Sequence, residues 1–383
     1  MVRPLYPDVK IEEMMDLPKH VVVFGATGVV GNAACRHFAT LPGWTVTAVS
    51  RRSLDAIAGV RSISVDLRDA NQAWSALSHL TDVTHVVFAA YAIEAGTSGW
   101  REPGQMDANL ALLKHALDPL LAGAPRLRHV SLLQGTKAYG EPDAVIPIPA
   151  KESAPRAPHA IFYWLQEDFL KKRLRQGRID GDPWSWTVLR PQIVFGVSWG
   201  SHMNLLPAIG AYAAVLKQEG SALHFPGGPS WTREAVDADL LAHALAWAAN
   251  SPSCQNEIFN ITNGDVFEWR NVWPAIAQSL GMPVGDDRPL SLAQTMPSRQ
   301  GEWASVVRTH QLRSPASLMD FVGQGFTYAD RQFCHGRSTP PPARLVSTIK
   351  ARQAGFSECI DTTLMFQKHF DSYQRLRWLP APR

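Results

Sequence analysis

The stretch that decides the fold is His20-Val21-Val22-Val23-Phe24-Gly25-Ala26-Thr27-Gly28-Val29-Val30-Gly31. A short β-branched run breaks into three glycines and then into a helix-compatible segment, which is the strand–turn–helix opening of a dinucleotide-binding βαβ unit. In such a turn Gly25 lets the chain reverse, Gly28 lets the backbone approach a pyrophosphate, and Gly31 lets helix and strand pack closely. The pyrophosphate would lie on unpaired N–H groups at the positive end of the helix dipole.

The residues after the second expected strand, 44–49, select the coenzyme. That strand ends in Ser50-Arg51-Arg52, and no carboxylate follows until Asp55. An NAD site usually has an Asp or Glu here for the ribose 2′-hydroxyl, whereas guanidinium groups match the oxygens of a phosphate. The pattern predicts NADPH rather than NADH; the alternative is a solvated basic turn without a ligand.

Composition describes a globular enzyme. The chain has 383 residues, of which 45% are hydrophobic and 19% charged, and a net charge of +3. That charge is too small to indicate a nucleic-acid or membrane partner. Four cysteines lie far apart without metal-ligand spacing, so we expect free thiols and no metal site. No window holds eighteen apolar residues, and the acidic first residues do not resemble a signal peptide, so we expect a cytoplasmic protein.

Strand-like and helix-like stretches alternate through the first half of the chain. Further strands are expected at 61–65, 85–90, 127–133 and 184–189, and helices at 110–121 and 160–176. This alternation predicts an α/β fold with a doubly wound, mostly parallel sheet that binds its ligand at the carboxyl ends of the strands. We expect a nucleotide-binding core at 18–198, to which 233–263 returns, and a smaller, mainly helical substrate-binding part at 199–232 and 264–383, rich in aromatic residues.

Several ordered motifs resemble one family. These are the glycine turn, Ser50-Arg51-Arg52, Leu133–Tyr139 (LQGTKAY), Phe162–Asp168 (FYWLQED), Arg190–Gly196 (RPQIVFG), Phe225–Gly228 (FPGG), Asp237–Leu240 (DADL) and Phe259–Trp269. Together they resemble the progesterone 5β-reductase and iridoid synthase group of short-chain dehydrogenases/reductases, most closely over residues 20–280. The resemblance implies a Rossmann fold of the extended, atypical short-chain reductase type, and a homodimer.

The resemblance also implies a reaction. The enzymes of this family use NADPH to reduce a carbon–carbon double bond conjugated to a carbonyl, so that negative charge collects on the carbonyl oxygen as an enolate. A lysine and a tyrosine stabilise that oxygen, and a preorganised donor of this kind contributes about 10²–10³-fold in rate. Lys137, in Gly135-Thr136-Lys137, falls on the family lysine.

The tyrosine departs from the family pattern. The family has two adjacent tyrosines before its Gln-Glu-Asp, and the second is catalytic; here that position is Trp164, and Tyr163 matches the neighbour. Three interpretations stay open. Trp164 forms a wall of the pocket while Tyr163 or Tyr139 reaches the oxygen; or Lys137 and the indole N–H suffice, with water protonating the α-carbon; or the chain has lost reductase activity. We take Lys137 and Tyr163 as the candidate catalytic residues.

The remaining candidates follow from the glycine turn and the resemblance. Glu167, rather than a lysine, stands four residues after Tyr163, which argues against ordinary alcohol dehydrogenase chemistry and leaves Glu167 and Asp168 as structural carboxylates. The coenzyme candidates are Gly25, Thr27, Gly28, Val29, Val30, Gly31, Ser50, Arg51, Arg52, Asp66, Leu67, Ala89, Ala90, Lys137, Val194, Ser201, His202 and Met203. The substrate candidates are Tyr91, Trp164, Trp199 and Met203.

The sequence thus predicts an NADPH-dependent reductase of the activated C=C bond of a small apolar enone or enal. Its alternatives are an NADPH-dependent carbonyl reductase and a catalytically weak cofactor-binding protein.

Overall fold

The computed structural model describes residues 18–52, 54–93, 102–141, 144–180 and 184–382. Seven parallel strands form one sheet in the order β3-β2-β1-β4-β5-β6-β9. Their bounds are β1 (Lys19–Phe24), β2 (Trp44–Ser50), β3 (Val60–Ser64), β4 (His85–Phe88), β5 (His129–Leu133), β6 (Ser185–Pro191) and β9 (Glu257–Ile261). The expected doubly wound parallel sheet is confirmed.

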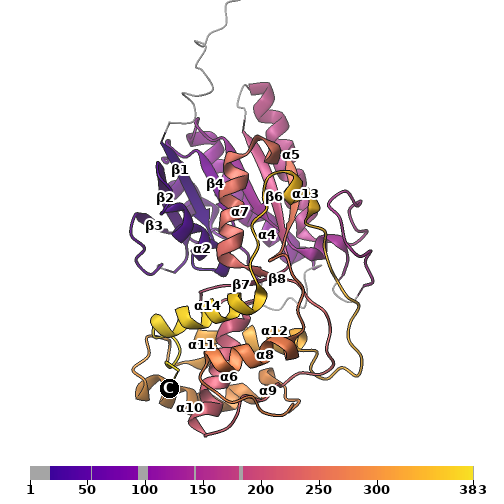
Figure 1. Ribbon diagram of the computed structural model, residues 1–383. Helices are drawn as coiled ribbons and strands as arrows, with labels where there is room; N and C mark the ends of the chain where they lie inside the picture. Colours follow the sequence, from indigo (N-terminus) through magenta and orange to yellow (C-terminus); the bar gives the residue numbers. More distant parts are fainter. Residues whose placement is uncertain (1–17, 53, 94–101, 142–143, 181–183, 383) are drawn as a thin grey trace, which may run out of the picture.

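Helices cover both faces of this sheet (Figure 1). Successive side chains of a strand point to opposite faces, so β1 contributes Val21 and Val23 to one core and Val22 and Phe24 to the other. The first core is closed by α2 (Val29–Phe38) and α7 (Ala238–Asn250). The second is closed by α3 (Ala70–Leu77), α4 (Pro103–Gly123) and α5 (Phe162–Asp180). An apolar strand buried on both sides is typical of a parallel sheet in this architecture.

A second, mainly helical part lies below the sheet in Figure 1. There β7 (Ile193–Phe195) pairs in parallel with β8 (Ala235–Asp237). The helices of this part are α6 (Leu205–Gln218), α8 (Trp269–Ser279), α9 (Leu292–Thr295), α10 (Gln300–Thr309), α11 (Leu318–Val322), α12 (Gly325–Gln332) and α14 (Thr362–Arg375), while α13 (Ile349–Gln353) packs on β9.

The aromatic residues of this second part form a hydrophobic core of their own. Phe225, Trp269, Trp273 and Trp303 are all almost completely buried there, between helices. The expectation that this aromatic-rich region lines a substrate chamber is therefore wrong for these four residues. Large apolar side chains suit the wall of a cavity and the inside of a helical layer equally well, so composition alone did not distinguish the two.

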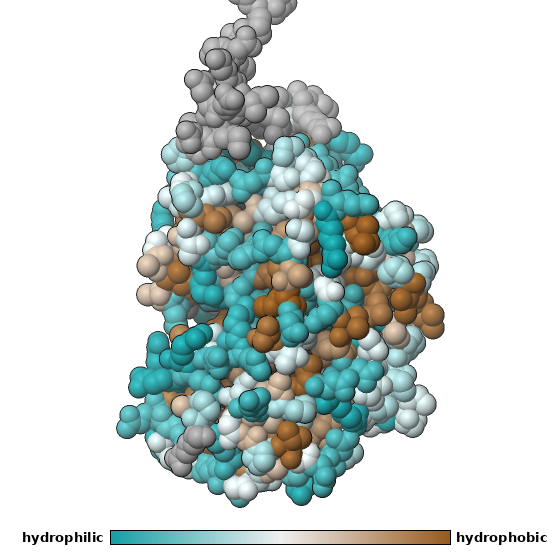
Figure 2. Space-filling model, in the orientation of Figure 1, coloured by the Kyte–Doolittle hydropathy of each residue, from teal (hydrophilic) through white to brown (hydrophobic). Residues whose placement is uncertain are grey.

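Figure 2 shows hydrophilic residues spread over the visible face, with apolar residues scattered among them. Within the described ranges no helix is both long enough and apolar enough to cross a bilayer.

The order of the strands places the site. The chain moves outward from β1 to β2 and β3, and then returns to the other side of β1 with β4. At such a reversal the loops after the two adjacent strands diverge and leave a crevice at their carboxyl ends. Gly25 follows β1 at this point, and Ala89 follows β4.

Candidate active site

A cavity of about 760 Å³ runs along the carboxyl ends of the strands. Each strand from β3 to β6 contributes the residues that directly follow it or end it: Asp66 and Leu67 after β3, Ser50–Arg52 at β2, Gly25–Val30 after β1, Ala89–Ala92 after β4, Gln134–Lys137 after β5, and Pro191–Val194 at β6 and β7. The cavity thus crosses the carboxyl ends of six neighbouring strands, which lie about 4.8 Å apart.

The glycine turn lies in the middle of this cavity. Gly25 has a φ of 77°, and a Cβ on it would stand 2.6 Å from the carbonyl oxygen of Ala89. A Cβ on Gly31 would overlap the carbonyl oxygen of Gly25, so only glycine allows α2 to approach β1 this closely. Gly28 is the N-cap of α2 and provides no side-chain cap for its first turn. The open N-terminus of α2 therefore faces the cavity and suits an anionic group.

A basic cluster borders the β2 end of the cavity. Arg51, Arg52 and His202 line it together, and burial together with the two guanidinium groups lowers the pKa of His202. The guanidinium of Arg52 lies 4.7 Å from the ring centre of Trp199, whose carbonyl oxygen it approaches at 3.4 Å. Trp199 thus supports Arg52 from outside the cavity. The expectation that Trp199 contacts substrate is corrected accordingly.

Asp66 is the one acidic side chain among the described residues that line the cavity. It accepts hydrogen bonds from Nε and Nη2 of Arg68, which hold the pKa of its carboxyl below the usual range. Its position after β3 is at the far end from Lys137.

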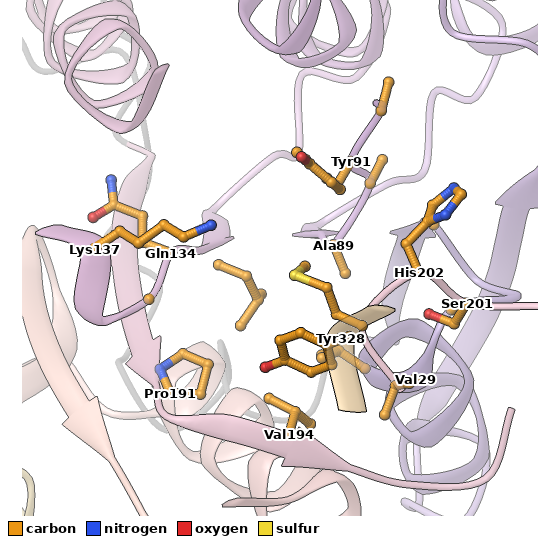
Figure 3. A pocket seen from close by; sticks show the side chains of 18 of the residues that line it. Val29, Ala89, Tyr91, Gln134, Lys137, Pro191, Val194, Ser201, His202 and Tyr328 are labelled. Atoms are coloured by element: carbon orange, nitrogen blue, oxygen red, sulfur yellow. The ribbon is translucent and has the colours of Figure 1, made fainter. Parts of the chain in front are cut away.

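Lys137 lies at the opposite end, on a short 3₁₀ turn, Thr136–Tyr139, after β5. Figure 3 shows its ammonium group, the hydroxyl of Tyr91 and the ring of Tyr328 turned toward the same space from three different elements. Burial, and then the charges of Arg331 and Arg344, lower the pKa of Lys137 to about 6. The lysine is thus held where its charge is costly until a negative group arrives beside it.

Tyr163 lies in the first turn of α5 and also lines the cavity. Its hydroxyl stands beside Gly135, where a Cβ would be 3.4 Å from the phenol oxygen. Burial raises the pKa of Tyr163 far above its ordinary value, so the hydroxyl keeps its proton and acts as a hydrogen-bond donor.

Trp164 is not among the residues that line this cavity. Its Nε1 donates to the carbonyl oxygen of His159 at 3.0 Å, and the guanidinium of Arg156 lies 5.1 Å from its ring centre. Adjacent helical residues point about 100° apart, so the indole faces away when Tyr163 faces inward. The substrate role expected for Trp164 is corrected, and its N–H is not placed to stabilise an enolate.

Tyr139 is also occupied elsewhere. Its hydroxyl donates to Oδ1 of Asn260 at 2.5 Å, at the end of β9, and its side chain packs beside Ile146. Of the aromatic donors considered from the sequence, Tyr163 is the one that faces the cavity.

Seven further residues, all after position 204, line the cavity and were not expected from the sequence. They are Arg233, Tyr328, Arg331, Gln332, Arg337, Pro341 and Arg344. These residues belong to no sequence motif. Local sequence spacing does not predict that the fold brings them next to β5 and β6.

Most of the predicted residues meet in this one cavity. Those that line it are Gly25, Thr27, Gly28, Val29, Val30, Ser50, Arg51, Arg52, Asp66, Leu67, Ala89, Ala90, Tyr91, Lys137, Tyr163, Val194, Ser201, His202 and Met203. Gly31 packs behind it, and Trp164 and Trp199 lie outside it. Elsewhere in the described ranges, no group of three His, Cys, Asp or Glu side chains is close enough together to hold a metal ion.

Solved structures share this fold at low sequence identity. A UDP-N-acetylglucosamine 4-epimerase from Methanobrevibacter ruminantium M1 matches with a TM-score of 0.63 and 17% identity, over 94% of this chain and 99% of that one. The terminal R domain from the myxalamid PKS-NRPS biosynthetic pathway matches with a TM-score of 0.61 and 14% identity, over 96% and 93%.

Proteins of known activity are similar over most of the sequence. A 3-oxo-Delta(4,5)-steroid 5-beta-reductase of Arabidopsis thaliana is 34% identical over 310 residues, 76% of this chain and 78% of that protein. An (S)-8-oxocitronellyl enol synthase of Antirrhinum majus is 30% identical over 380 residues, 94% and 92% of the two chains. The model of the PRISE-like Rossmann-fold domain matches residues 56–380. The resemblance predicted from the motifs is thus confirmed, and the chain belongs to the family defined by the PRISE-like Rossmann-fold domain.

Proposed function

We propose that this protein is an NADPH-dependent reductase of a carbon–carbon double bond conjugated to a carbonyl. The observation that carries the proposal is that Lys137 and Tyr163 line the same cavity as the glycine turn, at its β5 end. Relatives that cover most of the chain and are named as a steroid 5-beta-reductase and as an 8-oxocitronellyl enol synthase support it.

The residues of the β1 and β2 end fit a phosphorylated dinucleotide. The uncapped N-terminus of α2 suits the pyrophosphate, and Gly25 leaves no side chain between that helix and Ala89. Arg51 and Arg52, with His202 beside them and no carboxylate on Ser50-Arg51-Arg52, favour a 2′-phosphate over a free hydroxyl. When bound, NADPH supplies the hydride.

Lys137 and Tyr163 would act on the carbonyl oxygen of the substrate. That oxygen gains negative charge as the β-carbon is reduced, and an ammonium and a phenol hydroxyl beside it stabilise the enolate more than they stabilise the neutral enone. The raised pKa of Tyr163 suits a group that donates a hydrogen bond and keeps its proton. The α-carbon then takes a proton from water, which completes the saturated carbonyl product.

The test is oxidation of NADPH by the purified protein with a panel of enones and enals, with the product identified by NMR. A saturated ketone or aldehyde supports the proposal. An allylic alcohol would instead identify a carbonyl reductase, and stoichiometric NADPH binding without oxidation would identify a cofactor-binding protein. Lys137→Ala should lower turnover about 10²-fold while NADPH still binds, and unchanged turnover would contradict the role of this lysine.

A further inference from the structure

The β5–β6 end of the cavity is strongly basic. Besides Lys137, the described residues that line it include Arg233, Arg331, Arg337 and Arg344, and the one carboxylate on the whole lining, Asp66, is at the other end. A cluster of cations at one end of a cavity favours an anionic group on the molecule that binds there.

Two arginines of this group, Arg233 and Arg344, are buried. Arg344 donates hydrogen bonds to four backbone carbonyl oxygens, whereas Arg233 has a different environment. Only 7% of Arg233 is exposed, its Nη2 donates to Oε1 of Gln332 at 2.7 Å, and its guanidinium lies 3.8 Å from the ring centre of Trp231. Its Nε is buried without a hydrogen-bond partner. Burial lowers the pKa of Arg233 to about 10, and the charges of Arg344 and Arg331 contribute to this, while Tyr328 and Cys334 oppose it. Arg233 therefore remains a cation at neutral pH.

Another buried arginine, Arg190, has the ion-pair partner that Arg233 does not have among the described residues. Arg190 is equally buried, and Glu167 pairs with it at 3.0 Å. Arg233 forms no ion pair with any described residue: its neighbour Glu234 accepts hydrogen bonds from the backbone N–H of Val346 and from Gln192 instead. A buried cation without an ion-pair partner destabilises the fold, and an anion bound beside it would offset that cost.

Arg331 provides a second cation from α12, one residue before Gln332. Its side chain is exposed along the cavity, and its charge is close enough to Lys137 to lower the pKa of that lysine. Arg233 and Arg331 thus approach the same end of the cavity from two different elements. Tyr328 of the same helix also lines the cavity, and Figure 3 shows its ring turned toward the space that Lys137 faces.

Coenzyme phosphates do not account for this charge. The pyrophosphate site at α2 follows β1, while Lys137 follows β5, two strands further along the sheet. Strands lie about 4.8 Å apart, so the two sites are about 10 Å apart in the sheet direction alone. Arg233 lies just before β8, where its backbone forms an isolated antiparallel bridge with Phe267.

We propose that the substrate is an enone or enal that carries a carboxylate, which Arg233 and Arg331 bind while the carbonyl oxygen faces Lys137 and Tyr163. This rests on the proposed function and narrows it. The aromatic rings of Tyr91, Phe162 and Tyr328 contact the apolar segment between the two ends, and guanidinium forks bind the carboxylate oxygens. The proposed substrate is therefore an amphiphilic acid, whereas the sequence predicts a small apolar carbonyl compound.

The kinetic test compares a straight-chain methyl enone that ends in a carboxylate with its methyl ester, in a series whose linker is lengthened one methylene at a time. With the full chain and saturating NADPH, kcat/KM for the best acid should exceed that for its ester about tenfold or more. Arg331→Gln should remove most of this preference, because it lowers kcat/KM for the acid about tenfold relative to kcat/KM for the ester. Arg308→Gln, an exposed arginine on α10 outside the cavity lining, is the matched control and should keep the preference.

The binding test does not depend on turnover. Calorimetry measures the affinity of the NADP⁺-loaded protein for the saturated keto acid and for its methyl ester. Arg233→Gln and Arg331→Gln should each weaken binding of the acid about tenfold relative to binding of the ester. Arg233→Lys keeps the charge and should retain part of the preference for the acid. Should Arg233→Gln not fold, Arg331→Gln carries the comparison.

The outcomes separate the two proposals. Equal affinity for acid and ester in the unchanged protein overturns the carboxylate inference, even when both enones are reduced. Preferential binding of the acid without oxidation of NADPH by any enone supports the carboxylate site and overturns the proposed reduction.

Discussion

Glu167 and Arg190 form a buried ion pair, with Oε1 of the carboxylate 3.0 Å from Nη2 of the guanidinium. Gln134, which lines the cavity, joins both: its Nε2 donates to Glu167 and its Oε1 accepts from Nε of Arg190. The three residues link α5, β6 and the end of β5. Because Tyr163 precedes Glu167 by one turn of α5, this network holds the phenol in place relative to the loop that carries Lys137.

Replacing Glu167 with Gln should therefore destabilise the fold. Arg190 would keep its charge in a buried site without a counter-ion, which costs about 3–5 kcal/mol in the free energy of unfolding. Urea denaturation measures the loss. Asp168→Asn is the control, because Asp168 pairs with Arg156 at the surface and should contribute less than about 1 kcal/mol. Equal losses in the two variants would contradict the structural role of the pair.

Reduction should weaken as pH rises. The charged form of Lys137 is present below its pKa, which burial lowers to about 6 in the absence of a bound anion, and is lost as pH rises through that value. Because kcat/KM reports groups of the enzyme before substrate binds, we expect kcat/KM for the enone to fall from about pH 6 upward. A bound oxyanion raises the pKa of Lys137, so kcat should fall only at higher pH.

Lys137→Arg is the matched variant for this pH dependence. A guanidinium stays protonated over the whole range, so its profile should be flat there, although geometry lowers the rate. The measurement is kcat/KM at saturating NADPH between pH 5 and pH 9. An alkaline fall of the same midpoint in Lys137→Arg would assign the titration to another group.

Tyr163 and its neighbour Trp164 should respond differently to replacement by Phe. Tyr163→Phe removes a donor that faces the cavity and should lower kcat about 10²-fold. Trp164→Phe removes a hydrogen bond to the carbonyl of His159 outside the cavity, so kcat should change less than about threefold while stability falls by about 1 kcal/mol. A larger loss of kcat in Trp164→Phe than in Tyr163→Phe would restore the indole as the catalytic donor.

Coenzyme selectivity should depend on Arg51 and Arg52. Either replacement by Ala should raise the Kd of NADPH about 10- to 100-fold through the loss of a charge-assisted hydrogen bond to phosphate, and leave the Kd of NADH nearly unchanged. Titration by tryptophan fluorescence or calorimetry gives both constants. Arg308→Ala serves as the control, and parallel losses for the two coenzymes would show that the arginines do not recognise a 2′-phosphate.

The parts of this molecule that the sequence predicted are those set by local chemistry. The glycine turn and the apolar strands around it are determined within a dozen residues, and the doubly wound parallel sheet follows from the alternation of strands with helices. The orientation of Trp164 depends on the phase of α5, which in turn depends on the pairing of Glu167 with Arg190. Glu167 lies on α5 and Arg190 on β6, and the sequence does not show that these two residues pair.

The far end of the cavity depends on packing over long distances in sequence. Arg233 and Arg331 belong to no motif, and their shared position results from the helical core that holds α12 against α6 and α9. The same core takes Trp269 and Trp303, which the aromatic composition assigned to ligand binding. Only the tertiary structure determines whether an aromatic residue packs in the hydrophobic core or lines a ligand site.

Tyr328, Arg331 and Gln332 come from a single short helix, α12, while the coenzyme end of the cavity is built by residues before position 204. Changes confined to this eight-residue helix can therefore alter substrate specificity while the coenzyme site stays the same. Family members that act on different substrates can share one coenzyme site. Exchanging helix α12 between two members should transfer part of the substrate specificity.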